Sequence, residues 1–309
     1  MNDITNIDTN NYALMAKAMG FASENKKSSA KTVVLPRFRI WHQPIMGQAK
    51  VNGKTANVEV VEGGSYRLEV PSKEEDGEST FFFAKTAKFR VFAQRFMWRR
   101  FVANKNPKPN EPKGSFHRTL MADSLSADLK DNMGGFNCGK PSGYVKDFKA
   151  LPQNMQDLLR QIRKVRVLFG YATLIDSVDS EGKPIKVDTQ PVIWEIDNRN
   201  AVAHMGEVLT QIDRKQRLPI QHTISLVTEK NELPNGTSYY TPNALVDFNK
   251  SLDITDTDQS NFKDFMEYIK NYNEYINTQW SEKSADAQPS KDDMKVVESF
   301  VDIDDTEVA

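Results

Sequence analysis

Residues 88–100 read KFRVFAQRFMWRR and place five cationic and four aromatic side chains in thirteen positions. If the stretch is a β-strand, its side chains alternate between two faces. The even-numbered face then carries cations and rings, namely Lys88, Arg90, Phe92, Gln94, Phe96, Trp98 and Arg100. The odd-numbered face is mainly apolar, with Phe89, Val91, Ala93, Met97 and Phe101, and with Arg95 and Arg99 as exceptions. This pattern predicts a strand with one core face and one basic, aromatic face.

A second stretch, LPRFRIWH at residues 35–42, has the same alternation. Arg37, Arg39 and Trp41 fall on one face of a predicted strand, and Phe38, Ile40 and His42 on the other. If the two strands are neighbours in a sheet, they form one continuous surface that Arg163, Lys164 and Arg166 can extend. Such a surface suits single-stranded nucleic acid, because rings stack on bases of any sequence and cations follow the phosphates.

Two other interpretations of residues 88–101 remain open. Aromatic side chains in strands usually belong to a core, and neighbouring Arg and Lys side chains then cover the core edge with their alkyl stems. A helix is also compatible with the pattern, because it would bring Phe89, Phe92, Ala93 and Phe96 to one side.

Charge is distributed unevenly along the 309 residues, although the net charge is only -1. Residues 1–170 carry a net charge of +12 and residues 171–309 carry -13. The basic part can bind a polyanion, and the acidic part can meet a basic partner. There is no apolar run long enough for a membrane span and no signal-peptide pattern, so we expect a protein of the cytoplasm that does not bind a membrane. One cysteine and four scattered histidines predict neither a disulfide nor a metal site.

The order of predicted elements indicates an α+β, β-rich protein. Short, uneven strands with helical interruptions favour an OB-fold-like, partly open barrel with added helices. We expect four parts. They are an N-terminal helix and polar loop (1–31), a β-rich nucleic-acid-binding core (32–258), a C-terminal helix (259–285) and a disordered acidic tail (286–309). The tail ends in DDMKVVESFVDIDDTEVA, which is too charged and too poor in apolar residues to fold alone.

The segment GGFNCGKP at residues 134–141 almost matches a phosphate-binding loop. Pro141 stands where the Ser or Thr that binds Mg²⁺ is required, and no predicted strand precedes the loop. A Gly-rich turn with a basic tip at Lys140, close to a nucleic-acid backbone, is the better interpretation. We recognise no other catalytic arrangement, and we expect neither an enzyme nor a bound cofactor.

The basic, aromatic β core, the helix that follows it and the acidic tail with its phenylalanine resemble the replication-type single-stranded DNA-binding proteins of bacteriophages. The resemblance is one of organisation, over about residues 32–170 and 286–309. It implies an OB-fold that binds and protects single strands without sequence preference in phage replication or recombination, in the cytoplasm of the host cell. It also implies a groove and a tail that recruits replication or recombination proteins. The groove would be lined by Arg37, Arg39, Trp41, Lys88, Arg90, Phe92, Phe96, Trp98 and Arg100. The tail would act through Phe300, Asp302, Asp304 and Asp305.

Two other classes of function remain open. A phage structural or assembly protein would bury the same rings in its core and would have no role in binding nucleic acid. A nucleotide-dependent enzyme would need a phosphate cradle around Gly134–Lys140. Oligomeric state is not predicted by the sequence, and a homo-oligomer is compatible with it.

Overall fold

The segment at 88–100 lies within β6 (Thr86–Ala103), the longest strand of a large β-sheet. The structure is a computed structural model that describes residues 34–51, 54–72, 74, 77–104, 107, 111–142 and 145–286. The chain divides into two units, Met1–Val34 and Leu35–Ala309, and every element named below belongs to the second. The β-branched and aromatic residues of 88–101 therefore form a strand, and the helical alternative for this stretch is wrong.

Strands account for 41% of the structure. The strands before β6 are β1 (Arg37–Trp41), β2 (Ile45–Val51), β3 (Lys54–Val61), β4 (Ser65–Val70) and β5 (Thr80–Ala84). After it come β7 (Gly114–Arg118), β8 (Arg163–Ile175), β9 (Gln190–Ile196), β10 (Ile224–Glu232) and β11 (Ser238–Val246). The helices of the described residues are α2 (Gln153–Gln161), α3 (Arg199–Arg214) and α4 (Asp256–Asp286), with short 3-10 turns at Asn137–Gly139 and Pro219–Gln221.

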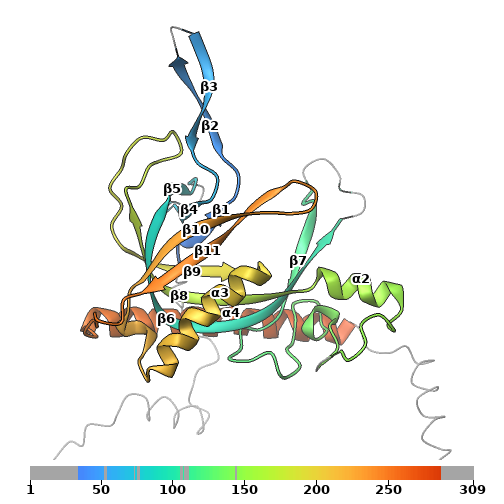
Figure 1. The fold of residues 1–309 in the computed structure, drawn as a ribbon. Coiled ribbons are helices and arrows are strands. Elements are labelled where there is room, and N and C mark those ends of the chain that lie inside the picture. Colours follow the sequence, from blue (N-terminus) through green and yellow to red (C-terminus); the bar gives the residue numbers. More distant parts are fainter. Residues whose placement is uncertain are drawn as a thin grey trace, which may run out of the picture. The chain divides into compact units, whose positions relative to one another are not determined.

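Nine of the strands form one open sheet in the order β11-β10-β6-β8-β9-β1-β4-β5, with β7 paired to the far end of β6 (Figure 1). Neighbouring strands are antiparallel except β1 and β9, which are parallel. β2 and β3 form a separate hairpin that projects away from the large sheet (Figure 1). The sheet curls enough for the Tyr66 hydroxyl on β4 to donate to the Val227 carbonyl on β10, at 3.0 Å.

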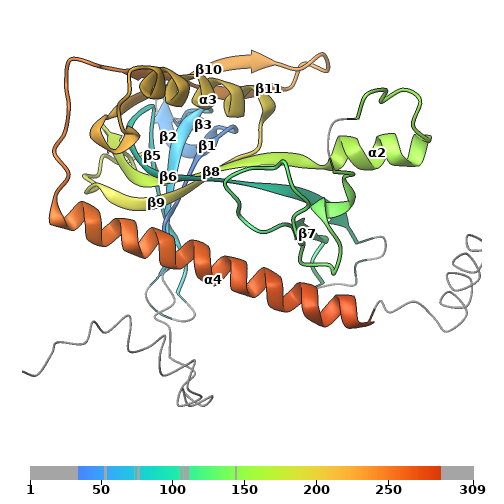
Figure 2. The ribbon, with the colours of Figure 1, turned by 90° about the horizontal axis from the view of Figure 1, so that it is seen from below.

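Helices cover both faces of the central strands (Figure 2). On one face α4 packs through Phe265, whose ring lies 5.8 Å from that of Phe169 on β8. On the other face lies α3, whose Gly206 approaches the guanidinium group of Arg166 on β8. The N-terminus of α3 is capped by Asn198, whose side chain accepts hydrogen bonds from the Asn200 and Ala201 amides.

The concave face of the sheet carries an aromatic core beneath α3. Phe38 of β1 stacks on Tyr66 of β4 at 5.2 Å and meets Trp194 of β9 edge-on at 5.1 Å. Phe89 of β6 contacts the same Trp194 at 5.4 Å. These four rings are almost completely buried, so Phe38 and Phe89 face the core as the two alternating patterns predict.

A β-bulge interrupts β6 at Phe92. Val91 pairs with Gly170 of β8 and Ala93 pairs with Phe169, so Phe92 is the extra residue. Because a single extra residue exchanges the two faces of a strand, the side chains after the bulge alternate in the opposite phase. Before it, even-numbered Arg90 and Phe92 face α4; after it, odd-numbered Met97 does, with its sulfur 3.5 Å from the Tyr272 hydroxyl. The prediction of a single basic, aromatic face from Lys88 to Arg100 is therefore wrong.

The predicted fold class is confirmed as a strand-rich mixture of helices and strands. The helices expected near 151–164, 200–215 and 261–280 correspond to α2, α3 and α4. The N-terminal helix within 1–31 and the acidic tail lie outside the described residues, and so do Phe300, Asp302, Asp304 and Asp305. The four-part division and the OB-fold-like barrel remain predictions.

Candidate nucleic-acid interface

The residues predicted to line one groove fall into three separate places. β1 and β6 are not neighbours, because β8 and β9 lie between them. The continuous surface expected from these two strands side by side is therefore absent. The bulge then divides the β6 residues themselves between the two faces of the sheet.

The first place lies before the bulge, on the face covered by α4. Arg90 is embedded there: its guanidinium group donates to the Asp258 carboxylate at 3.1 Å and to the Ile220 and Asp253 carbonyls at 2.5 and 3.0 Å. Phe92 packs against Tyr171 and Phe265, with ring centres 4.7 and 5.6 Å away. Lys88 is exposed. Arg90 and Phe92 thus hold α4 and its preceding loop against the sheet, and neither is available to line a groove.

The contacts of Asp258, and not its burial, determine the ionisation of its carboxylate. Burial raises the pKa of Asp258, but hydrogen bonds from Thr255 and the positive charge of Arg90 outweigh it, so the net shift of the pKa is downward. Asp258 is therefore charged at neutral pH. The two side chains are only 13% and 4% exposed. Removing either partner would leave the other as an isolated buried charge.

The second place lies after the bulge, on the opposite face, and is where the cations and rings do come together. Phe96 lies between two cations of β8, with Lys164 Nζ 4.9 Å and Arg166 Cζ 5.1 Å from the ring centre. Lys140 Nζ lies 4.9 Å from the Trp98 ring. Cross-strand pairing fixes this arrangement, because Phe96 is opposite Arg166 and Trp98 is opposite Lys164. We call this set the platform, consisting of Phe96, Trp98, Arg100, Lys140, Lys164 and Arg166.

Polar contacts orient the cations of the platform. Arg166 donates to the Gln94 side chain, and Arg100 Nη2 donates to His117 Nδ1 at 3.1 Å. Burial lowers the pKa values of Lys164 and Arg166, and the charge of Arg166 adds to the effect on Lys164. Within the described residues, no Asp or Glu forms an ion pair with Arg100, Lys164 or Arg166. These three cations thus concentrate positive charge that the carboxylates of the described residues leave unneutralised.

Arg163 lies apart from the platform. It pairs with Arg99 across β6 and β8, one position away from Lys164. Since successive side chains point to opposite faces, Arg163 lies on the opposite side of the sheet from Lys164 and Arg166. The prediction that these three cations lie close together along the chain is correct, but only Lys164 and Arg166 share a face.

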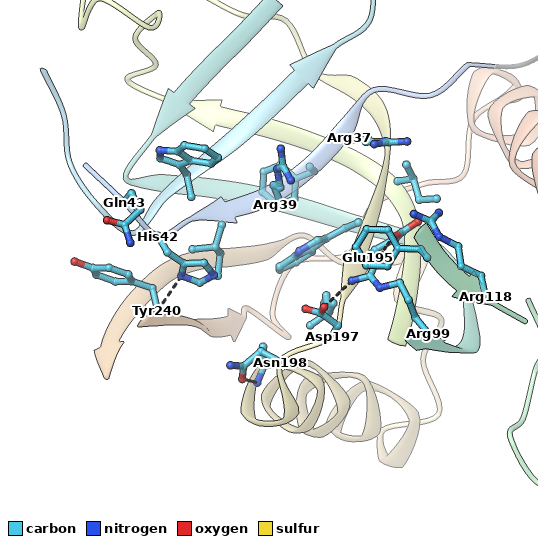
Figure 3. Close-up of a pocket in the computed structure, with 18 residues that line it drawn as sticks. Arg37, Arg39, His42, Gln43, Arg99, Arg118, Glu195, Asp197, Asn198 and Tyr240 are labelled. Atoms are coloured by element: carbon cyan, nitrogen blue, oxygen red, sulfur yellow. Dashed lines mark hydrogen bonds and ion pairs between the residues drawn. The ribbon is translucent and has the colours of Figure 1, made fainter. Parts of the chain in front are cut away.

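The third place contains Arg37, Arg39 and Trp41, which line a cleft of about 610 Å³ between β1 and β9 (Figure 3). Arg37 and Arg39 are exposed, and Trp41 is half-buried. Arg39 pairs with Glu69 at 3.3 Å. Arg67 lies 4.6 Å above the Trp41 ring, so β4 contributes a cation to the group. His42 also lines the cleft, and its Nδ1 accepts the Tyr240 amide hydrogen at 3.1 Å.

Several cleft residues were not singled out from the sequence. Arg99 of β6 contacts Glu195 and Asp197, each at 2.6 Å. Arg118 of β7 lies 5.2 Å from the Phe116 ring, which also faces the cleft. The only local signal for Arg118 is the alternation in SFHR, and Arg99 was assigned to a core face. Their place in the cleft depends on pairing between distant strands, which no local pattern contains.

Amides of the Gly-rich turn at residues 134–140 and of Met133 bind a carboxylate of the protein itself, that of Asp131. Asp131 is 3% exposed, and its carboxylate accepts hydrogen bonds from the amides of Met133, Gly135 and Cys138, at 2.9, 3.1 and 3.1 Å. Asn137, Cys138 and Gly139 adopt positive φ values, and of their amides only that of Cys138 binds Asp131, because Asn137 donates to the Leu129 carbonyl and Gly139 to the Phe136 carbonyl. Burial, and to a smaller extent the negative charge of Asp131, raise the pKa of the Cys138 thiol to about 12. The amides of Met133, Gly135 and Cys138 therefore bind a carboxylate of the protein, while Lys140 reaches the Trp98 ring.

The described part of the chain contains no group of three or more His, Cys, Asp or Glu side chains that could hold a metal ion. It also contains no helix that combines the length and the hydropathy needed to cross a membrane.

Comparisons with family models, with curated proteins and with solved structures found no match to this chain.

Proposed function

We propose that this protein binds single-stranded DNA without sequence preference, in phage replication or recombination, and that it is not an enzyme. In this proposal the curled sheet is the counterpart of a partly open OB-fold, and the acidic tail recruits replication or recombination proteins. The phage context and the role of the tail come from the resemblance in organisation. The DNA-binding role is argued from the platform.

The observation that carries the proposal is the stacking of cations on half-buried rings on one face. A base can replace Lys164 on the Phe96 ring or stack on the Arg166 guanidinium plane, and the displaced ammonium group then meets a phosphate. Neither interaction distinguishes one base from another. The cations carry the phosphate attraction, since each neutralised phosphate releases counterions from the strand.

The test is a titration of fluorescent oligo-dT with the full chain over a salt series. We expect micromolar or tighter binding at about 50 mM salt that weakens as salt rises. The double substitution Lys164→Glu, Arg166→Glu should weaken binding by about a hundredfold and reduce the salt dependence by about two phosphate contacts.

Lys88→Glu is the matched control, because it reverses the charge of another exposed lysine of the same sheet, away from the platform. Its effect on affinity should be small. Absence of binding at low salt would refute the function. It would favour the alternative of a structural or assembly protein. Equal losses for Lys88→Glu and the platform variant would refute the assignment of the site.

A further inference from the structure

The cleft between β1 and β9 arises because two parallel strands separate. They pair at Arg37 and Ile193, where the Ile193 amide donates to the Pro36 carbonyl at 3.0 Å. Beyond that point the described residues of the two strands form no further register pair. β1 continues its pairing with β4 and β9 continues with β8. The space of about 610 Å³ between them is enough for a nucleotide-sized ligand.

The walls of the cleft combine flat rings with unpaired backbone edges. Trp41 lines the cleft and is half-buried, and Figure 3 shows His42 and Tyr240 at the end opposite Arg37 and Arg118. The His42 and Tyr240 rings are stacked, with centres 6.3 Å apart. In an extended strand, amide and carbonyl groups point alternately to its two sides. The sides of β1 and β9 that face the cleft therefore present donors and acceptors that match the polar edge of a nucleobase.

The charges of the cleft favour an anionic group. Its carboxylates, Glu195 and Asp197, both bind Arg99. Arg37 and Arg118 form no ion pair with any carboxylate among the described residues. Arg39 has one partner, Glu69, and its side chain remains 48% exposed. An incoming phosphate would thus meet guanidinium groups whose charge is available.

We propose that this cleft binds one nucleotide, with its base against the half-buried Trp41 ring and its phosphate on Arg37 and Arg118. The inference rests on the proposed function only in the class of ligand. Arg118 pairs with Arg99 and therefore lies on the opposite face of the sheet from Lys164 and Arg166, so the cleft is a second site and not a continuation of the platform. The same chemistry would also accept a free nucleoside monophosphate.

Isothermal titration calorimetry of the full chain with dTMP tests the site. We expect one site with a Kd on the order of 0.1 mM, and much weaker binding of thymidine, which lacks the phosphate. Arg37→Ala with Arg118→Ala should weaken dTMP binding at least tenfold. The platform variant Lys164→Glu, Arg166→Glu should retain dTMP binding while it loses oligo-dT. Thermal unfolding confirms that each variant is folded.

The outcomes separate the two proposals. If dTMP gives no saturable heat, or if the arginine variant binds it as well as the parent chain, the cleft proposal is wrong, even when oligo-dT still binds at the platform. If dTMP binds but oligo-dT does not, the cleft proposal stands and the proposed function fails.

Single abasic substitutions along oligo-dT identify the source of the nucleotide. A loss of affinity at one position, with competition by dTMP, assigns the site to the bound strand. A uniform response without competition assigns it to a free nucleotide.

Discussion

The two halves of β6 have nearly the same sequence pattern and opposite surroundings. Before the bulge, Arg90 and Phe92 alternate as a cation and a ring, and α4 and its preceding loop cover both. After it, Phe96, Trp98 and Arg100 alternate in the same way, and cations of β8 and of the Gly-rich turn approach the rings instead. Alternating cations and rings therefore do not by themselves indicate a binding face. The partner strand and the covering helix determine whether such a pattern stabilises the fold or remains available to a ligand.

Arg90→Ala should cause the largest loss of stability among these substitutions. It leaves the Asp258 carboxylate buried without its cation, so the free energy of unfolding should fall by about 3 kcal/mol or more. Urea denaturation measures the loss. Lys88→Ala, two residues away and exposed, should change stability by less than about 0.5 kcal/mol. Equal stability of the Arg90 variant and the parent would mean that α4 does not depend on this ion pair.

Phe92→Ala and Phe96→Ala test the two halves of β6 directly, since the residue type and the strand are the same. Phe92→Ala should reduce the free energy of unfolding by about 2–3 kcal/mol, because it removes contacts with Phe265 and Tyr171, and should leave oligo-dT affinity unchanged. Phe96→Ala should weaken oligo-dT binding about tenfold and should reduce the free energy of unfolding by less than Phe92→Ala does. Denaturation and DNA titration on both variants provide the four values. If one of the two variants had the larger loss in both stability and oligo-dT affinity, the two halves of β6 would not differ in role.

We expect only a modest dependence of stability on pH. His42 and His117 accept hydrogen bonds at Nδ1 from the Tyr240 amide and from Arg100, so both bonds require neutral rings. Burial lowers both pKa values; Asp197 opposes the shift at His42, whereas Arg100 reinforces it at His117. The unfolded chain then binds protons more readily than the folded one. Stability should be complete above about pH 6.5 and should decrease as the pH falls through the lowered values.

Denaturation at about pH 7.5 and about pH 5.5 measures this dependence. The double substitution His42→Gln, His117→Gln should reduce the difference between the two conditions. A variant with the same difference as the parent would show that other groups cause it.

Local periodicity was sufficient to predict several elements. The apolar spacing of α3 and α4 and the β-branched run of β9 contain their own signals, and Phe38 and Phe89 were correctly assigned to the core. The bulge at Phe92 was not predictable in this way, because it is defined by which residues of β8 lie opposite Val91 and Ala93. The cleft likewise depends on β1 lying beside β9, a contact between segments separated by about 150 residues of sequence.

The predicted groupings of site residues were correct where they depended on local alternation and wrong where they depended on contacts between distant segments. Arg37, Arg39 and Trp41 do share a face, and Phe96, Trp98 and Arg100 do as well, because each set lies within one uninterrupted run of a strand. Assigning Arg90 to a ligand failed because its partner, Asp258, comes from the loop and helix that follow β11. No property of residues 88–100 identifies that carboxylate. These residues are cationic and aromatic whether they contact DNA or the body of the protein.

Asp131 gives the Gly-rich turn the character of a receptor that is already occupied. Its carboxylate is joined to the amides of Met133, Gly135 and Cys138 by only a few residues of chain, so its effective concentration at those amides is far above that of any dissolved anion. A phosphate would have to compete with a tethered ligand and to displace a buried charge from its three donors. The three amides that such a loop could offer to a phosphate are therefore already hydrogen-bonded to a carboxylate of the chain itself.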